Sequence, residues 1–170
     1  MLDENVVKLL NEQINKEFYS AYLYMDMANY YSEKSLNGFE NWFNVQTQEE
    51  RDHALLFRQY ILNNGGSVTL LPIDAPAKKY DNFREPLVAA LKHEQYVTAS
   101  INAIYDEAYK CRDFRTMQFL DWFIKEQGEE EKNADDNIKK FDLFASDAKG
   151  LYMLDNEMKA RVYIVTSLVI

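Results

Sequence analysis

Several acidic side chains and one histidine fall where helical spacing would otherwise place apolar residues. In one segment Glu50 and His53 are three residues apart, which puts them on the same face of a helix. Burying several carboxylates together is costly through desolvation and repulsion unless cations compensate. Because carboxylates with an imidazole suit iron or manganese, the pattern predicts a pair of divalent metal ions. The inward-facing candidates are Glu17, Glu50, His53, Glu94, Gln127 and Glu130.

The two halves of the chain repeat this arrangement with a period of 77 residues. Glu17 recurs as Glu94, and the motif that ends at His53 recurs as Gln127-x-x-Glu130. One Glu from each of two helices and a Glu-x-x-His from each of two others is the scheme of di-iron bundles. The second half has Gln127 and Glu130 in place of Glu and His, so we expect two unequal metal positions. A lone Glu-x-x-His is usually a surface pair, but four matching segments favour a metal centre.

These side chains belong to long segments with helical periodicity. Three Pro and five Gly are present, and most of them lie between residues 38 and 86, which leaves long stretches of good helix formers. The prediction is one all-α domain over residues 1–170, with a four-helix bundle at about 3–144 and a short fifth helix at about 151–165. The expected long helices span about residues 3–32, 36–64, 81–110 and 113–144.

The connections between these helices predict how the bundle is wired. The first and second helices, and the third and fourth, are separated by a few residues, so each pair should be antiparallel neighbours. Residues 65–80 contain Pro72 and Pro76 and, when extended, reach roughly 50 Å. A 28-residue helix is about 42 Å long, so this linker permits a single long crossover along the bundle.

Composition excludes several other classes of protein. The net charge of −9 and the lack of a basic stripe argue against nucleic acid as a partner. The N-terminus has no apolar signal core, and the apolar stretch 162–170 is too short to cross a bilayer, so we expect no membrane insertion. The single cysteine, Cys111, fits the reducing cytoplasm.

The chain resembles the bacterial non-haem ferritins over nearly its whole length. The residues that carry the resemblance are 10–15, 48–53, 93–95, 121–123, 126–131 and 150–152. The resemblance implies a ferritin-like bundle with one iron held by Glu17, Glu50 and His53. It implies a second iron held by Glu50, Glu94 and Glu130, with Gln127 beside the pair.

The resemblance also implies surroundings and an activity for this centre. A weaker third cation position would use Glu49, Glu126, Glu129 and Glu130, and Tyr24 and Trp122 would flank the irons. The implied activity is that of a ferroxidase, which oxidises Fe(II) with O₂ or H₂O₂ and stores the mineral inside a cage of about 24 identical subunits. No methionine stands where haem-binding relatives carry their axial ligand, so haem is not expected.

Two other functions fit a di-metal bundle. One is a peroxide-reducing protein similar to rubrerythrin, although a single cysteine cannot supply the usual Cys-x-x-Cys iron domain. The other is a scaffold whose metals only stabilise the fold.

The sequence leaves the roles of two features undecided and gives an expectation for a third. Tyr24 is either core packing or part of the centre, and the packing of the apolar tail after residue 161 is undetermined. His93, beside Glu94, is expected at the surface or between subunits.

Overall fold

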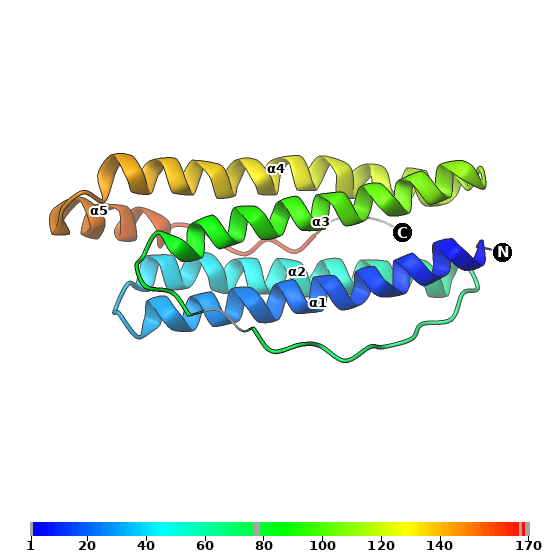
Figure 1. Ribbon diagram of the computed structural model, residues 1–170, viewed down its shortest axis with the longest axis horizontal. Helices are drawn as coiled ribbons and strands as arrows, with labels where there is room; N and C mark the ends of the chain where they lie inside the picture. The colour runs from blue at the N-terminus through cyan, green and yellow to red at the C-terminus, as the bar shows by residue number, and fades with distance from the viewer. Residues whose placement is uncertain (1, 77–78, 167, 169–170) are drawn as a thin grey trace.

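The computed structural model describes residues 2–76, 79–166 and 168, which form a bundle of four long helices and a short fifth helix (Figure 1). Neighbouring helices in each short-linked pair are antiparallel, as predicted. None of the helices in these ranges is both long enough and apolar enough to cross a membrane. The helices are α1 (Glu4–Ser32), α2 (Asn37–Asn63), α3 (Glu85–Lys110), α4 (Phe114–Phe144) and α5 (Ala148–Met158).

Both tight helix connections use a non-glycine residue in the left-handed backbone region. Ser35 has a φ of 59° and Arg112 a φ of 58°. The amide that follows each residue donates to the carbonyl five positions back, at 3.1 Å after Ser35 and 2.8 Å after Arg112. These bonds offset the roughly 1–2 kcal/mol that the left-handed conformation costs. Because the two residues are 77 positions apart, the internal repeat includes these turns as well as the predicted metal ligands.

The long connection between α2 and α3 runs along the outside of α1 (Figure 1). Two asparagines of α1 hold it in place. The amide of Asn11 donates to the carbonyl of Ser67 at 3.1 Å, and its oxygen accepts from the backbone amide of Thr69 at 2.7 Å. Asn15 donates to the carbonyls of residues 71–72 at 3.3 and 2.9 Å. The predicted single crossover is therefore confirmed, and it leaves α2 and α3 parallel.

The predicted buried stripes of the four long helices are confirmed, and they divide the core into two apolar clusters. One cluster includes Met27, Tyr31, Phe39 and Phe43, and the other includes Leu10, Phe57, Ile101 and Phe123. The polar candidates on the same stripes lie between these two clusters in each helix. Apolar packing therefore fixes both ends of a short polar layer in the middle of the bundle.

Helix α3 starts later than the predicted residues Asp81 or Asn82. The oxygen of the Asn82 side chain accepts from the backbone amides of Arg84 and Glu85 at 3.1 and 3.2 Å, which closes a separate turn. Pro86 then lies in the first turn of the helix. Backbone amides in the first turn have no partner within the helix, so the lack of an amide proton in proline costs no hydrogen bond there.

Helix α5 starts three residues earlier than predicted and also ends earlier. The sequence places Gly150 before the helix, but Asp147 is the cap, because its carboxylate accepts from the amide of Gly150 at 2.7 Å. Glycine is needed there because a Cβ would lie 1.8 Å from the carbonyl oxygen of Phe144. The helix stops at Met158, so the residues beyond it are free to run extended along the bundle.

The start of α2 is capped by α5 rather than by its own sequence. Leu36 is the residue before α2 and gives no side-chain cap. Asp155 of α5 is buried, and its Oδ1 accepts from the amides of Gly38 and Phe39 at 2.7 and 3.1 Å. A Cβ at Gly38 would lie 1.6 Å from the carbonyl oxygen of Asp155, so glycine lets the two helices touch. This contact fixes the direction in which the chain leaves α5.

Candidate metal centre

The structure brings together three of the predicted ligands from α1 and α2. Glu17, Glu50 and His53 each offer a ligand atom, and these atoms all lie within 4.8 Å of one another. Nδ1 of His53 is 3.6 Å from Oε2 of Glu50. The three residues are at most 2% exposed. A buried imidazole and two carboxylates at this separation can hold a metal ion.

Two glutamines orient the carboxylates of this triad. Gln13 donates to Oε1 of Glu17 at 2.8 Å, and Gln46 donates to Oε1 of Glu50 at 2.9 Å. The other oxygen of Glu17, Oε2, is buried and has no hydrogen-bond partner among the described residues. Buried carboxylate oxygens without a partner are rare, and a cation between Glu17 and Glu50 would satisfy this one. The donor set therefore fits a bound metal.

The roles of Gln13 and Gln46 were not among the sequence predictions. Each glutamine precedes its glutamate by four residues, which is the spacing of neighbours on one helical face. The repeated Gln-x-x-x-Glu spacing is the sequence feature from which the hydrogen bonds of Gln13 and Gln46 to the two glutamates could have been predicted.

The charges of the metal-free triad are strongly perturbed. Burial, with the repulsion of Glu50, raises the pKa of Glu17 to about 8. Burial alone would raise the pKa of Glu50 too, but the hydrogen bond and charge of His53 lower it. Burial opposes the charge of His53, yet the hydrogen bond and charge of Glu50 raise its pKa to about 10. In the absence of metal, a protonated His53 and a proton on Glu17 offset part of the negative charge of the buried carboxylates.

The remaining ligand candidates, Glu94 and Glu130, face the same layer from α3 and α4 but do not join the close triad. The hydroxyl of Tyr24 donates to Oε1 of Glu94. Gln127 donates to Oε2 of Glu94 at 3.1 Å. Burial and the charge of Glu50 raise the pKa of Glu94 well above its usual range and that of Glu130 to about 7. Tyr24 therefore contacts the polar layer rather than serving only as packing.

Aromatic rings border the centre. The His53 ring packs edge-on against Trp122 and Phe123, with ring centroids 5.6 and 5.8 Å apart. Phe43 stacks on Tyr24 at 5.8 Å. These rings limit the access of water to the layer and so strengthen the electrostatic interactions within it.

The residues predicted for a third cation have a different environment. Glu49 and Glu126 are half-buried and Glu129 is exposed. In the part of the chain that the structure describes, their carboxylates and that of Glu130 do not converge as the triad does. Glu49 instead forms an ion pair with Arg161, with Nη2 and Oε2 2.5 Å apart. No sequence signal links these residues, which are 112 positions apart.

His93 is not a free surface residue in the subunit. It lies between α3 and α1, where one ring nitrogen is 2.7 Å from the hydroxyl oxygen of Ser20. Its ring contacts Tyr19 and Tyr24 at 5.8 and 5.9 Å. Burial lowers the pKa of His93, which is consistent with a neutral packing residue. His93 is thus half-buried in the single subunit, and its place at the surface or between subunits stays a prediction.

Comparison with solved structures supports the fold over its full length. An engineered closed form of the Archaeoglobus fulgidus ferritin is 38% identical and superposes with a TM-score of 0.94, covering 96% of this chain and 100% of that chain. The open-pore ferritin of the same hyperthermophilic archaeon is also 38% identical, with a TM-score of 0.92, covering 95% and 98%.

Sequence comparison agrees with the structural one. A bacterial non-haem ferritin of Campylobacter jejuni is 35% identical over 159 residues, which are 94% of this chain and 95% of that protein. One from Staphylococcus aureus is 33% identical over 163 residues, 96% and 98% of the two chains. The ferritin-like domain model matches residues 7–144, a range that contains every predicted metal ligand. The chain therefore belongs to the ferritin family, and it groups with the bacterial non-haem ferritins.

Proposed function

We propose that the chain is a subunit of an iron-storage ferritin whose buried centre oxidises Fe(II). The observation that carries this proposal is the triad of Glu17, Glu50 and His53, together with the unpartnered Oε2 of Glu17. Packing alone does not explain this ligand set, because apolar side chains of the same size in its place would make the core more stable.

Fe(II) is the substrate of this reaction. Two Fe(II) ions give one electron each to O₂, which takes up two protons and leaves as H₂O₂ together with two Fe(III) ions. Glu17 and His53 would hold one ion, Glu94 and Glu130 the other, and Glu50 would contact both. Gln13 and Gln46 keep the carboxylates of Glu17 and Glu50 oriented toward the ions. With H₂O₂ as the oxidant, two Fe(II) ions give one electron each, two protons are taken up, and the products are two Fe(III) ions and two water molecules.

Oxidation of Fe(II) under air, followed by absorbance, tests the activity. The expected result is a rapid phase that consumes two Fe(II) per subunit, well above the rate of Fe(II) in buffer alone. Oxidation no faster than in buffer would support the alternative of a structural metal site and overturn the proposal.

The two iron positions should differ in affinity. The triad has an imidazole and two carboxylates, whereas the other side has Gln127 where the repeat has Glu50. Glu94 is also engaged by Tyr24 and Gln127 and has a raised pKa, so it must release a proton to bind metal. We expect affinities that differ by roughly tenfold or more, about 1.4 kcal/mol. Anaerobic titration with Fe(II) measures both.

Restoring the missing carboxylate provides the matched variant for this test. Gln127→Glu should narrow the gap between the two affinities, because it adds a negative charge to the weaker side. Two equal affinities in the unmodified protein would contradict the assigned asymmetry.

The subunit should assemble into a closed cage. Large apolar side chains are exposed at both ends of the bundle, which is unusual for a monomer. Twenty-four chains of 20.0 kDa make a particle of about 480 kDa, which native mass spectrometry resolves from smaller species. A dimer across physiological salt would favour the rubrerythrin-like alternative. The exposed residues include Tyr109, Phe114, Leu143, Tyr152 and Met153.

A further inference from the structure

The chain beyond α5 returns along the bundle beside α2 (Figure 1). We call residues 159–166 the C-terminal strap. Lys159 contacts α5, and Arg161 and Tyr163 contact α2. Asn41 donates to the backbone carbonyls of Lys159 and Arg161 at 3.4 and 3.0 Å. Further along, the hydroxyl of Tyr163 donates to the carboxylate of Asp52. These contacts place the strap next to the helix that carries Glu50 and His53.

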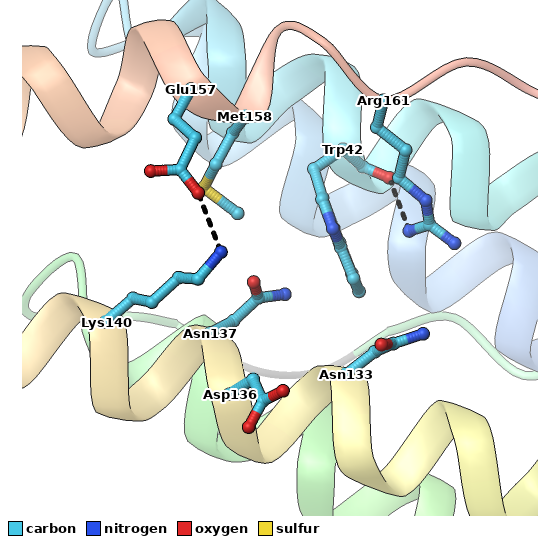
Figure 2. Close-up of a pocket in the computed structure, with 8 residues that line it drawn as sticks. All are labelled: Trp42, Asn133, Asp136, Asn137, Lys140, Glu157, Met158 and Arg161. Carbon is cyan, nitrogen blue, oxygen red and sulfur yellow. Dashed lines mark hydrogen bonds and ion pairs between the residues drawn. The ribbon is translucent and has the colours of Figure 1, made fainter.

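The central contact of the strap is the guanidinium of Arg161. Nη2 donates to Oε2 of Glu49 at 2.5 Å. Nη1 donates to the backbone carbonyl of Trp42 at 3.3 Å, as Figure 2 shows. The guanidinium carbon lies 4.2 Å from the centre of the Trp42 ring. The Arg161 side chain is 20% exposed and that of Glu49 is 19% exposed. A charge-assisted bond, a backbone bond and a cation–π contact together hold one rotamer of Arg161.

The guanidinium of Arg161 places a positive charge beside the acidic residues that adjoin the proposed metal centre, which include Glu49 and Glu126. Glu49 adjoins Glu50 in α2, and the charge of Glu126 in α4 repels it. Arg161 supplies the positive charge that pairs with the Glu49 carboxylate. Arg161 also lines a cavity of about 300 Å³ between α2, α4 and α5, which Figure 2 shows. The ion pair therefore joins a residue that lines this cavity to the residue that precedes Glu50 in α2.

We propose that Arg161 is a built-in cation that competes with a third divalent metal ion for Glu49. With Arg161 in place, the carboxylate of Glu49 already has a cationic partner, and a metal ion that binds the same oxygen must displace the guanidinium. The strap thus limits binding of cations at this position. The inference rests on the proposed function, since it concerns the third cation position beside the ferroxidase centre.

Two cations cannot share the same Glu49 oxygen at contact distance, because their charges repel and the carboxylate has few free lone pairs. Removing the charge of Arg161 should therefore raise the affinity of the third position about tenfold. The strap should stay in place, because Asn41 and Tyr163 anchor it independently of the guanidinium.

Zn²⁺ is a suitable probe because it does not change oxidation state. We would titrate the assembled, metal-free protein with Zn²⁺ by calorimetry and resolve the two ions of the centre from a weaker third. Arg161→Met keeps the apolar stem over Trp42 and removes the charge. Arg161→Lys keeps the charge but loses the planar fork. We expect the third Zn²⁺ to bind about tenfold more tightly in Arg161→Met and close to the original affinity in Arg161→Lys.

Lys140→Met is the matched control. Lys140 lines the same cavity and pairs with Glu157 at 2.7 Å, so its loss removes one positive charge without freeing Glu49. In Lys140→Met, the affinity for the third Zn²⁺ should change little. In Arg161→Met, the additional substitution Glu49→Gln should abolish the gain, which assigns it to that carboxylate.

The outcomes separate this inference from the proposed function. Two tight Zn²⁺ ions per subunit with an unchanged third affinity in Arg161→Met would overturn the role of Arg161 alone. The same holds if no third Zn²⁺ is detected in either protein, or if Lys140→Met gives an equal gain. The absence of the two tight ions would instead count against the proposed ferroxidase centre.

Discussion

Glu50→Ala should abolish the rapid phase of Fe(II) oxidation. In the proposed centre Glu50 would contact both ions, because it lies beside His53 on α2 and its charge acts on both Glu17 and Glu94. Without it, His53 and Glu17 would hold a single ion, and the two electrons that O₂ requires would no longer come from one centre. Loss of groups that only support ligands costs roughly 10–100-fold, so we expect a loss of at least about a hundredfold.

Stopped-flow absorbance on assembled variant cages measures this effect. Glu50→Gln keeps the side-chain volume while removing the charge, and it should lose the rapid phase as well. Glu33→Ala changes an exposed glutamate beyond the end of α1 and serves as the control. Both Glu50 variants should fold, because loss of a carboxylate relieves repulsion on Glu17 and Glu94 in the metal-free protein. A Glu50→Ala cage that still oxidises two irons per subunit rapidly would place the centre elsewhere.

The metal-free protein should become less stable as the pH rises from about 5 to about 8. The pKa of Glu17 is raised from 4.5 to about 8 and that of Glu130 from 4.5 to about 7. In this window the folded state holds protons that the unfolded chain has already released, so the free energy of unfolding falls with pH. The pKa of His53 is raised from 6.5 to about 10, so above pH 6.5 His53 also lowers the free energy of unfolding as the pH rises. The lowered pKa of Glu50 acts only at more acidic pH.

Thermal unfolding of the chelated, assembled protein tests this dependence. One pKa unit corresponds to about 1.4 kcal/mol and one kcal/mol to about 2–4 °C in a chain of this size, so Tm should fall by on the order of 10 °C. Saturating Zn²⁺ should remove the fall, because metal binds the deprotonated ligands and stabilises the folded state more at higher pH. Glu17→Gln should flatten the curve without metal. A Tm that is constant or rises with pH in the chelated protein would contradict the buried titration.

The polar layer was largely predictable from the sequence because helical periodicity is a local property. Glu17, Glu50, His53, Glu94, Gln127 and Glu130 occupy positions on apolar stripes, and all six are buried in the structure. The period of 77 residues then relates the two halves, and the long linker restricts how they are wired. The helix ends were predicted less well at α3 and α5, where Asn82 and Asp147 form turns or caps that outweigh the nearby proline and glycine signals.

Contacts between distant segments were decided by the tertiary structure. The sequence left the role of Tyr24 open, and only the packing of α1 against α3 brings its hydroxyl to Glu94. Asp155 caps α2 from a helix 117 residues away, and Arg161 reaches Glu49 because that cap directs the chain along α2. Such pairings depend on where whole helices lie. Spacing along the chain therefore determined which side chains face inward, whereas three-dimensional packing determined which of them touch and which carboxylate the protein neutralises with its own arginine.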